Sequence, residues 1–332
     1  MVCISARRSL CMGMLAAATL ASVGSAWAEG SSAYPNPARQ IRIIVPFTAG
    51  GSSDVQARML ADRLGRMWNQ AVVVENKPGA GGHLGGKYVS DQPADGYTLM
   101  VGSIGLHAAY AVYKKLPYDP AKELRVVTVL AEMPHVVVAT PNLPVRNLQE
   151  LTALAKQEPG SINFGSAGVG SSVHMMGELY KLQSGAPIVH VPYRGSSAAL
   201  NDLLGGQIQL MFENPPTVLA HVKGGKLKAL AITSKHASPK FPGVKSLHEL
   251  GFTNFEVEPW YGMIGSKGLP KDLAERMNKY VQEILAQDSV KQKISDLGAD
   301  AFGMSTGEFA KLIRPDIKKW GAAVKASGAT AD

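Results

Sequence analysis

The sequence predicts an α/β fold with mostly parallel sheets, and three observations lead to this prediction. Apolar runs rich in β-branched residues alternate with amphipathic helical segments along most of the chain. Glycine and small hydroxyl residues recur where an apolar run ends and a helical segment begins. The composition is that of a globular protein, since 45% of the 332 residues are apolar and 18% are charged. The only long apolar run lies at the N-terminus, which excludes a multispanning membrane protein.

That N-terminal run has the pattern of an export signal over residues 1–28. Arg7 and Arg8 form a positive start, residues 10–23 are apolar, and Ala26-Trp27-Ala28 matches a small-x-small cleavage site. We therefore expect cleavage after Ala28 and a periplasmic location. A buried N-terminal helix is the alternative, and the sequence leaves open whether the Sec or the twin-arginine route is used.

Cleavage changes the composition of the mature chain. Removing 28 of the 332 residues leaves 304, and the loss of Arg7 and Arg8 lowers the net charge from +8 to +6. Both cysteines, Cys3 and Cys11, lie in the signal. The mature chain is then free of thiols, which excludes thiol catalysis, zinc–thiolate sites and iron–sulfur clusters.

The hydrophobic pattern predicts the elements in order along the chain. Strands are expected at 41–47, 71–75, 97–103, 125–140, 188–193, 208–212 and 227–234. Helices are expected at 52–68, 147–158, 171–183 and 196–204, followed by two long helical segments at 270–298 and 306–325. The length favours two domains, and the chain would cross between them at 130–140 and 254–265.

Four glycine- and serine-rich loops follow predicted strands, at 46–54, 102–107, 165–172 and 191–197. In open α/β sheets the ligand crevice lies at these carboxyl ends of strands. The free N–H groups at the start of the following helix, helped by the helix dipole, can bind an anion. Any one such loop is more often a turn with a helix cap, but four in one chain favour a shared crevice.

Several enzyme and cofactor motifs fail on inspection. Residues 81–88 have the glycine and lysine spacing of a phosphate-binding loop, but Tyr88 stands where a Ser or Thr must hold magnesium. The chain has no dinucleotide fingerprint, nucleophile elbow or His-Glu-x-x-His sequence. His174 and Glu178 are four apart and can bind a metal edge-on, but we interpret them as a surface or hinge-facing polar pair. No enzyme activity, cofactor or metal is expected.

A few side chains near these loops are open to two interpretations. His107 and His174 lie just inside crevice loops, where a structural histidine is the common case. Arg194 can form a fork with a carboxylate or lie at the rim in solvent. Trp260 and Tyr261 can wall a ligand or pack the second crossing segment.

Short segments spread over most of the mature chain carry a family resemblance. They are Ile41-Arg42-Ile43-Ile44-Val45-Pro46-Phe47 with Ala49-Gly50-Gly51-Ser52-Ser53-Asp54, Val74-Glu75-Asn76-Lys77-Pro78-Gly79-Ala80-Gly81-Gly82, Asp95-Gly96-Tyr97-Thr98-Leu99, Tyr118-Asp119-Pro120, Val191-Pro192-Tyr193-Arg194-Gly195 and Trp260-Tyr261-Gly262, with Tyr34-Pro35 before them. In order and spacing the chain resembles the substrate-binding receptors of tripartite tricarboxylate transporters, the Bug family of periplasmic solute receptors.

The resemblance implies a type II periplasmic-binding-protein fold, with two α/β domains that close on a ligand like a hinge. Domain I would comprise residues 29–133 and 256–332, and domain II residues 134–255. The ligand would be a small organic carboxylate, delivered by a monomeric receptor to the membrane permease subunits of a tripartite transporter, without a nucleic-acid partner. A receptor that feeds a signalling partner, or a periplasmic hydrolase using the same cleft, are the alternatives.

The resemblance also implies the ligand contacts, position by position. They are Phe47, Thr48, Ala49, Gly51, Ser52, Asp54 and Ser103 from the first domain, and Ser166, Gly170, Ser171, His174, Tyr193, Gly195, Ser196, Ser197, Ala198 and Glu213 from the second. Two positions depart from the family pattern. Glu213, followed by Asn214, stands where Asp is common, and His83 stands where Asn is usual, so the resemblance does not define the ligand.

Overall fold

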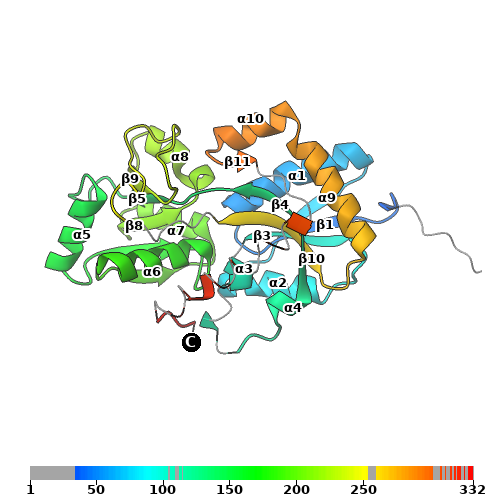
Figure 1. The fold of residues 1–332 in the computed structure, drawn as a ribbon, viewed down its shortest axis with the longest axis horizontal. Helices are drawn as coiled ribbons and strands as arrows, with labels where there is room; N and C mark the ends of the chain where they lie inside the picture. The colour runs from blue at the N-terminus through cyan, green and yellow to red at the C-terminus, as the bar shows by residue number, and fades with distance from the viewer. Residues whose placement is uncertain are drawn as a thin grey trace, which may run out of the picture. The chain divides into compact units, whose positions relative to one another are not determined.

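Two β-sheets with flanking helices make up the described part of the chain (Figure 1). The computed structural model describes residues 34–103, 105–108, 112–113 and 115–252, then 259–301 and parts of 307–331. The predicted export signal therefore lies outside the described residues. Residues 34–39 form a separate short turn, in which the Arg39 N–H donates to the Asn36 carbonyl oxygen at 3.0 Å.

The first sheet has six strands in the order β11–β4–β10–β3–β1–β2. Their bounds are β1 Ile41–Val45, β2 Val72–Asn76, β3 Thr98–Ser103, β4 Leu124–Glu132, β10 Trp260–Ser266 and β11 Asp300–Ala301. β1 pairs in parallel with β2 and β3. β10 returns from late in the chain and lies antiparallel between β3 and β4.

The second sheet has five strands in the order β7–β6–β8–β5–β9. Their bounds are β5 Val136–Ala139, β6 Asn163–Ser166, β7 Val189–Pro192, β8 Leu210–Glu213 and β9 Lys228–Ile232. β6 pairs in parallel with β7 and β8, whereas β5 is antiparallel to both of its neighbours.

The α/β class is confirmed, but the expectation of mostly parallel sheets is wrong. Five of the nine strand pairings among the described residues are antiparallel. Four of the five arise because β5 and β10 each lie antiparallel to both of their neighbours, and the fifth joins β11 to β4 at the edge of the first sheet. The predicted strand 125–140 is two strands, one in each sheet, because Pro134 interrupts the run and donates no hydrogen bond. No strand range was predicted at the position of β6, although the loop 165–172 was expected to follow a strand.

The helices connect the strands in the expected alternation. They are α1 Ser52–Trp68, α2 His83–Ser90, α3 Gly105–Ala108, α4 Pro120–Glu123, α5 Leu148–Gln157, α6 Ser172–Ser184, α7 Ser196–Leu204, α8 Pro215–Lys223, α9 Lys271–Leu285 and α10 Asp288–Asp296. The predicted helical segment 270–298 is two helices, α9 and α10, separated at Ala286 and Gln287. The predicted helical segment 306–325 lies largely outside the described residues.

Alternating strand residues form a core on both faces of the second sheet. On β5, Val137 and Ala139 pack with α5 and α6, while Val136 and Val138 pack with α7 and α8. A strand that is buried on both faces is apolar at every position rather than at alternate ones. This packing holds the N-terminal ends of α6, α7 and α8 at the same edge of the sheet as the ends of β6, β7 and β8.

The chain passes between the two sheets twice. It leaves the first sheet after β4 and enters the second at β5, and it returns between β9 and β10. The two connections are bonded to each other, since the His135 N–H donates to Thr233 Oγ1 at 2.8 Å and the Met133 N–H to the Pro259 carbonyl at 3.2 Å. Of the predicted crossing 254–265, residues 254–258 lie outside the described residues, and 260–265 belong to β10 rather than to a linker.

Candidate functional site

A small cavity of about 20 Å³ lies where strand ends and helix starts from both sheets meet. Six of its twelve lining residues are serines, and none of the side chains that line it is charged. The lining residues are Phe47, Gly51, Ser52, Ser53, Ser103, Ala167, Ser171, Ser172, Val173, Ser196, Asn214 and Tyr261. They come from the ends of β1, β3, β6 and β8, the starts of the helices that follow, and β10.

Four helices begin at this cavity. The N-cap residues of α1, α6 and α8 are Gly51, Ser171 and Asn214, and all three line it. α7 begins beside it at Ser196. The first N–H groups of a helix have no partner within the helix, and the helix dipole adds a partial positive charge there. The cavity therefore offers several N–H donors to an anion without a cationic side chain.

The loop from β1 to α1 is held by Asp54. The Asp54 carboxylate accepts hydrogen bonds from the Gly50 N–H at 3.0 Å, from the Arg58 guanidinium at 2.9 and 3.0 Å, and from Asn76 Nδ2 at 2.9 Å. Burial by itself raises the pKa of Asp54, but the hydrogen bonds from Arg58, Gly50 and Asn76 hold it below its usual value. The carboxylate stays ionised and fully occupied, behind the loop rather than in the cavity.

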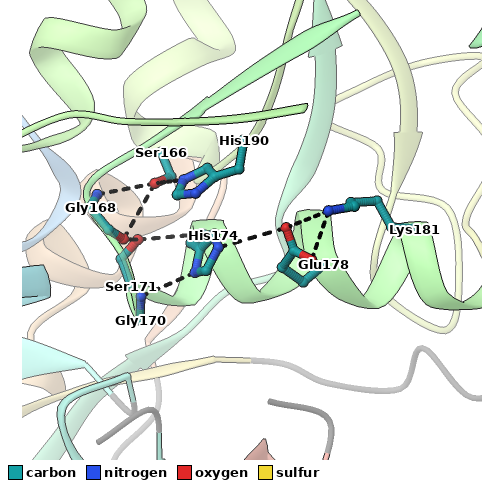
Figure 2. Close-up of polar contacts among 8 residues, drawn as sticks. All are labelled: Ser166, Gly168, Gly170, Ser171, His174, Glu178, Lys181 and His190. Carbon is teal, nitrogen blue, oxygen red and sulfur yellow. Dashed lines mark hydrogen bonds and ion pairs between the residues drawn. The ribbon is translucent and has the colours of Figure 1, made fainter. Parts of the chain in front are cut away.

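The loop from β6 to α6 is held by two histidines (Figure 2). The Gly170 N–H donates to His174 Nδ1 at 3.1 Å, and His174 Nε2 lies 3.7 Å from Glu178 Oε1. His190 Nε2 lies 2.6 Å from Ser166 Oγ, and this hydroxyl in turn accepts from the Gly168 N–H at 3.1 Å. The centroids of the two imidazole rings lie 3.9 Å apart, and the ring planes are tilted by 30°.

This cluster corrects one expectation. His174 and Glu178 were interpreted as a surface or hinge-facing polar pair, but they are only 2% and 4% exposed. Their burial is possible because Lys181 Nζ donates to both Glu178 carboxylate oxygens at 3.0 Å. Of His107, the other histidine singled out above, the side chain lies outside the described residues.

Loops from the two sheets touch each other around the cavity. Ser52 Oγ lies 3.2 Å from Thr217 Oγ1, and Ser197 Oγ donates to the Ala49 carbonyl oxygen at 2.6 Å. A Cβ added at Gly195 would lie 2.0 Å from Thr48 Oγ1, so only glycine permits this approach. The structure is thus closed over the cavity.

Glu213 lies beneath this closed site, at the end of β8, and is completely buried. Its Oε1 accepts from the backbone N–H and the side-chain Nδ2 of Asn214 at 2.9 and 3.0 Å. Burial raises the pKa of Glu213, and the hydrogen bonds from Asn214, with the nearby hydroxyls of Ser196 and Thr217, offset this only in part. Glu213 holds the side-chain amide of Asn214, and it is Asn214 rather than Glu213 that lines the cavity.

A second, wider pocket of about 1250 Å³ borders the same loops. Its lining includes Thr48, Tyr193, Arg194 and Ala198. The Tyr193 hydroxyl donates to Asp202 Oδ2 at 2.7 Å and is not directed at a ligand. Tyr113 also lines this pocket, and its hydroxyl donates to the Val169 carbonyl oxygen at 2.6 Å, which joins the two loop sets again.

The structure divides the seventeen predicted contact residues into three groups. Those that line the small cavity are Phe47, Gly51, Ser52, Ser103, Ser171 and Ser196. Those that line the wider pocket are Thr48, Tyr193 and Ala198. The remaining eight line neither space and lie in or behind the loops. They are Ala49, Asp54, Ser166, Gly170, His174, Gly195, Ser197 and Glu213.

Six lining residues were not among the predicted contacts, namely Ser53, Ala167, Ser172, Val173, Asn214 and Tyr261. Ser53, Ser172 and Val173 lie in the first turns of α1 and α6, where the helix starts themselves were the available signal. Asn214 stands directly after Glu213 and carries the N-cap position of α8. Tyr261 comes from β10, whose pairing with β3 could not be read from local sequence.

The described residues contain neither a metal site nor a membrane-spanning helix. No three His, Cys, Asp or Glu side chains among them are grouped closely enough to hold a metal ion. None of the described helices has the length and apolar character needed to cross a membrane.

Comparison with known proteins gives the family. The model of the tripartite tricarboxylate transporter family receptor matches residues 56–329. The chain is 36% identical over 312 residues to protein BugT of Bordetella pertussis, which covers 93% of this chain and 95% of BugT.

Two solved structures are similar throughout. A protein of R. palustris with adipate is 32% identical with a TM-score of 0.85, over 89% of this chain and 99% of that one. MatC from Rhodopseudomonas palustris with bound malate is 30% identical with a TM-score of 0.83, over 87% of this chain and all of the other.

These matches confirm the predicted resemblance and the predicted fold. Proteins of this family are periplasmic receptors of transporters and not enzymes. The chain belongs to the receptor family of the tripartite tricarboxylate transporters, and its two mixed α/β sheets form the fold of a periplasmic binding protein.

Proposed function

We propose that this protein binds a small organic carboxylate at this cavity, between the loops of the two sheets, and delivers it to a membrane transporter. The observation that carries the proposal is the convergence of four helix N-termini on a cavity lined by hydroxyl groups and no charged side chain. A buried carboxylate needs several aimed donors to replace its hydration. The first-turn N–H groups of α1 and α6, with the hydroxyls of Ser52 and Ser172, supply donors of this kind.

Bound ligands in two relatives support a dicarboxylate or hydroxy-dicarboxylate. Adipate and malate, which accompany the two R. palustris structures, both carry two carboxylates on a short chain. In this form the cavity is about 20 Å³, well below the usual range for small-molecule sites, so we expect the loops of the two sheets to move apart to hold a ligand of this size. We propose that the six predicted residues lining the cavity contact the ligand, and that Asn214 and Tyr261 contact its far end.

The remaining predictions are part of the same proposal. Residues 1–28 direct export and are removed after Ala28, so the receptor acts in the periplasm as a monomer. Domain I comprises residues 29–133 and 256–332 and domain II residues 134–255. The paired connections at His135 and Thr233 serve as the hinge for opening and closing. The closed form is then recognised by the permease subunits of a tripartite transporter.

Calorimetry on the mature chain tests the proposal. We expect malate or adipate to bind with a measurable Kd, and the corresponding neutral diamides not to bind. A Ser172→Asp variant places a carboxylate at the first position of α6, inside the cavity, and we expect it to abolish binding. Ser289→Asp is the matched control, because it adds the same charge to the first turn of α10 at an exposed site. Equal binding of acids and diamides, or unchanged binding by the Ser172→Asp variant, would overturn the proposal.

A further inference from the structure

The two loops that begin α1 and α6 share one arrangement. In each, a glycine with positive φ stands two residues before the helix, Gly50 at +85° and Gly170 at +81°. In each, the side chain of the third helical residue accepts the N–H of that glycine, Asp54 at 3.0 Å and His174 at 3.1 Å. Glycine adopts a positive φ without steric cost, which lets its N–H turn toward the helix that follows. The same position in the two helices supplies the acceptor that holds this N–H in place.

The acceptor in the second loop is a neutral imidazole. Because Nδ1 accepts the Gly170 N–H, the ring proton must be on Nε2, which faces Glu178 Oε1 at 3.7 Å. Burial, with His190 and Lys181 acting in the same direction, lowers the pKa of His174 to about 2. Glu178 is itself paired with Lys181, so the buried charges behind α6 are balanced (Figure 2).

His174 acts behind the binding surface. Its side chain is 2% exposed and is absent from the linings of both pockets. Its neighbours Ser171 and Ser172 do line the cavity. The loop is held a second time through His190, Ser166 and the Gly168 N–H, and Ser171 Oγ donates to the Gly168 carbonyl at 2.7 Å. These contacts leave the loop's own polar groups satisfied. Since the His174 N–H donates to Ser171 Oγ at 3.3 Å, the N–H groups of Ser172 and Val173 are those that remain for a ligand.

The charge of the acceptor differs between the two loops for a physical reason. Asp54 brings a negative charge into the first turn of α1, and Arg58 pairs with it there. The first turn of α6 contains no acidic residue. A neutral acceptor at position 174 therefore supports Gly170 without cancelling the partial positive charge at the N-terminus of α6.

We propose that His174 is a positioning residue that supports Gly170 as a neutral acceptor and so keeps the N-terminus of α6 available for the ligand carboxylate. This inference rests on the proposed function. It assigns to His174 a role through the loop rather than a contact with the ligand.

Three substitutions separate the acceptor from its charge. His174→Asn keeps a neutral acceptor, because an Asn oxygen can take the place of Nδ1, and we expect malate or adipate affinity within about threefold of wild type. His174→Leu removes the acceptor, and we expect affinity to fall about tenfold. His174→Asp reproduces the Gly50–Asp54 arrangement without an arginine partner, and we expect a loss of at least about tenfold that is reduced at high salt.

Controls distinguish this role from a purely structural one. His236→Leu removes an exposed histidine, and it should leave affinity unchanged. Nitrogen NMR of the imidazole should show the Nε2–H tautomer of His174, with its Nδ1 coupled to the Gly170 N–H. This signature does not require any variant to fold.

The outcomes are distinguishable from those of the proposed function. If the wild-type protein binds neither acid, the proposed function fails. If it binds and the Leu and Asp variants bind equally well, or if NMR shows a protonated Nδ1, the positioning role of His174 is overturned.

Discussion

The loop between β1 and α1 and the loop between β6 and α6 face each other across the cavity and are built alike, with different acceptors. In the first, the acceptor is ionised Asp54, whose charge is balanced by Arg58 and whose oxygens also hold Asn76. In the second, the acceptor is neutral His174, whose ring packs against that of His190. The backbone geometry of an anion site and its electrostatics are therefore set by separate features. Glycine and an acceptor set the geometry, and the charge of the acceptor sets how much of the helix dipole remains.

Acidification should break the comparison most strongly, because the histidines titrate and Asp54 does not. Burial lowers the pKa values of His83 and His190 to about 4, of His135 to about 3 and of His174 to about 2. The unfolded chain binds more protons than the folded one below the ordinary histidine pKa of about 6.5. The contribution to stability is therefore complete above about pH 6.5 and is lost as the pH falls.

We expect the free energy of unfolding to drop by about 1 kcal/mol for each of these histidines between about pH 6.5 and 5.5. Glu213, whose pKa is raised by burial, acts in the opposite direction and offsets part of the loss. Urea unfolding of the mature protein across this range measures the drop. In a His135→Leu variant this drop in unfolding free energy should be smaller than in the wild type by about 1 kcal/mol. A constant unfolding free energy from about pH 7 to 5.5 would contradict this account.

Removing the charged acceptor should destabilise the first loop. Asp54→Ala leaves the Gly50 N–H without its acceptor and Arg58 without its carboxylate partner, while Asn76 keeps its hydrogen bond to the Phe47 carbonyl oxygen. We expect the free energy of unfolding to fall by about 3 kcal/mol. The matched control is Asp62→Ala, which breaks the exposed Asp62–Arg66 pair about two turns further along α1. That change should be below about 1 kcal/mol. Chemical denaturation measures the free energy of unfolding of both variants. Equally small losses for Asp54→Ala and Asp62→Ala would show that Asp54 does not support the loop.

Separating the two loop sets should weaken binding while leaving the fold stable. In Gly195→Ala the new Cβ would lie 2.0 Å from Thr48 Oγ1 and 2.8 Å from Thr48 N, so the closed state is disfavoured. Opening relieves the clash, and we expect ligand affinity to fall about tenfold or more with little change in unfolding free energy. Gly307→Ala is the control, since no atom of the described residues lies within 4 Å of its Cβ position. Calorimetry with unchanged affinity for Gly195→Ala would exclude closure on the ligand.

A single contact across the cavity should have the smallest effect. Thr217→Val removes the hydroxyl that lies 3.2 Å from Ser52 Oγ, and we expect affinity to fall about threefold. Thr152→Val provides the comparison, because it removes a hydroxyl contact to Tyr180 within the second sheet's core. It should lower stability but not affinity. A Thr217→Val variant with lower stability but unchanged affinity would mean that the Ser52–Thr217 contact plays no part in closure.

Local sequence was enough for the elements whose ends carry strong signals. The predicted helices 52–68 and 196–204 match α1 and α7 residue for residue, because glycine precedes each and the apolar spacing is regular. Mixed sheet order was not predictable in the same way. The insertion of β10 between β3 and β4 joins segments more than a hundred residues apart, and no local pattern records such a pairing.

In the candidate site, too, the loops could be predicted from local sequence, but the contacts that support them could not. The strand-end loops with Gly51, Ser52 and Ser171 were recognisable from glycine and hydroxyl residues after apolar runs. The support behind the loops was not recognisable, because the contact between Gly170 and His174 depends on the rotamer of a buried ring. Asn214 was overlooked in favour of Glu213, since only the structure shows which of the two reaches the cavity.

A crystal structure of the mature protein with malate or adipate tests the central claim most directly. This account predicts that one ligand carboxylate accepts hydrogen bonds from first-turn N–H groups of α6, with Ser172 beside it and the Gly170–His174 hydrogen bond intact. A carboxylate bound instead by Arg194 in the wider pocket, with the small cavity empty, would contradict it.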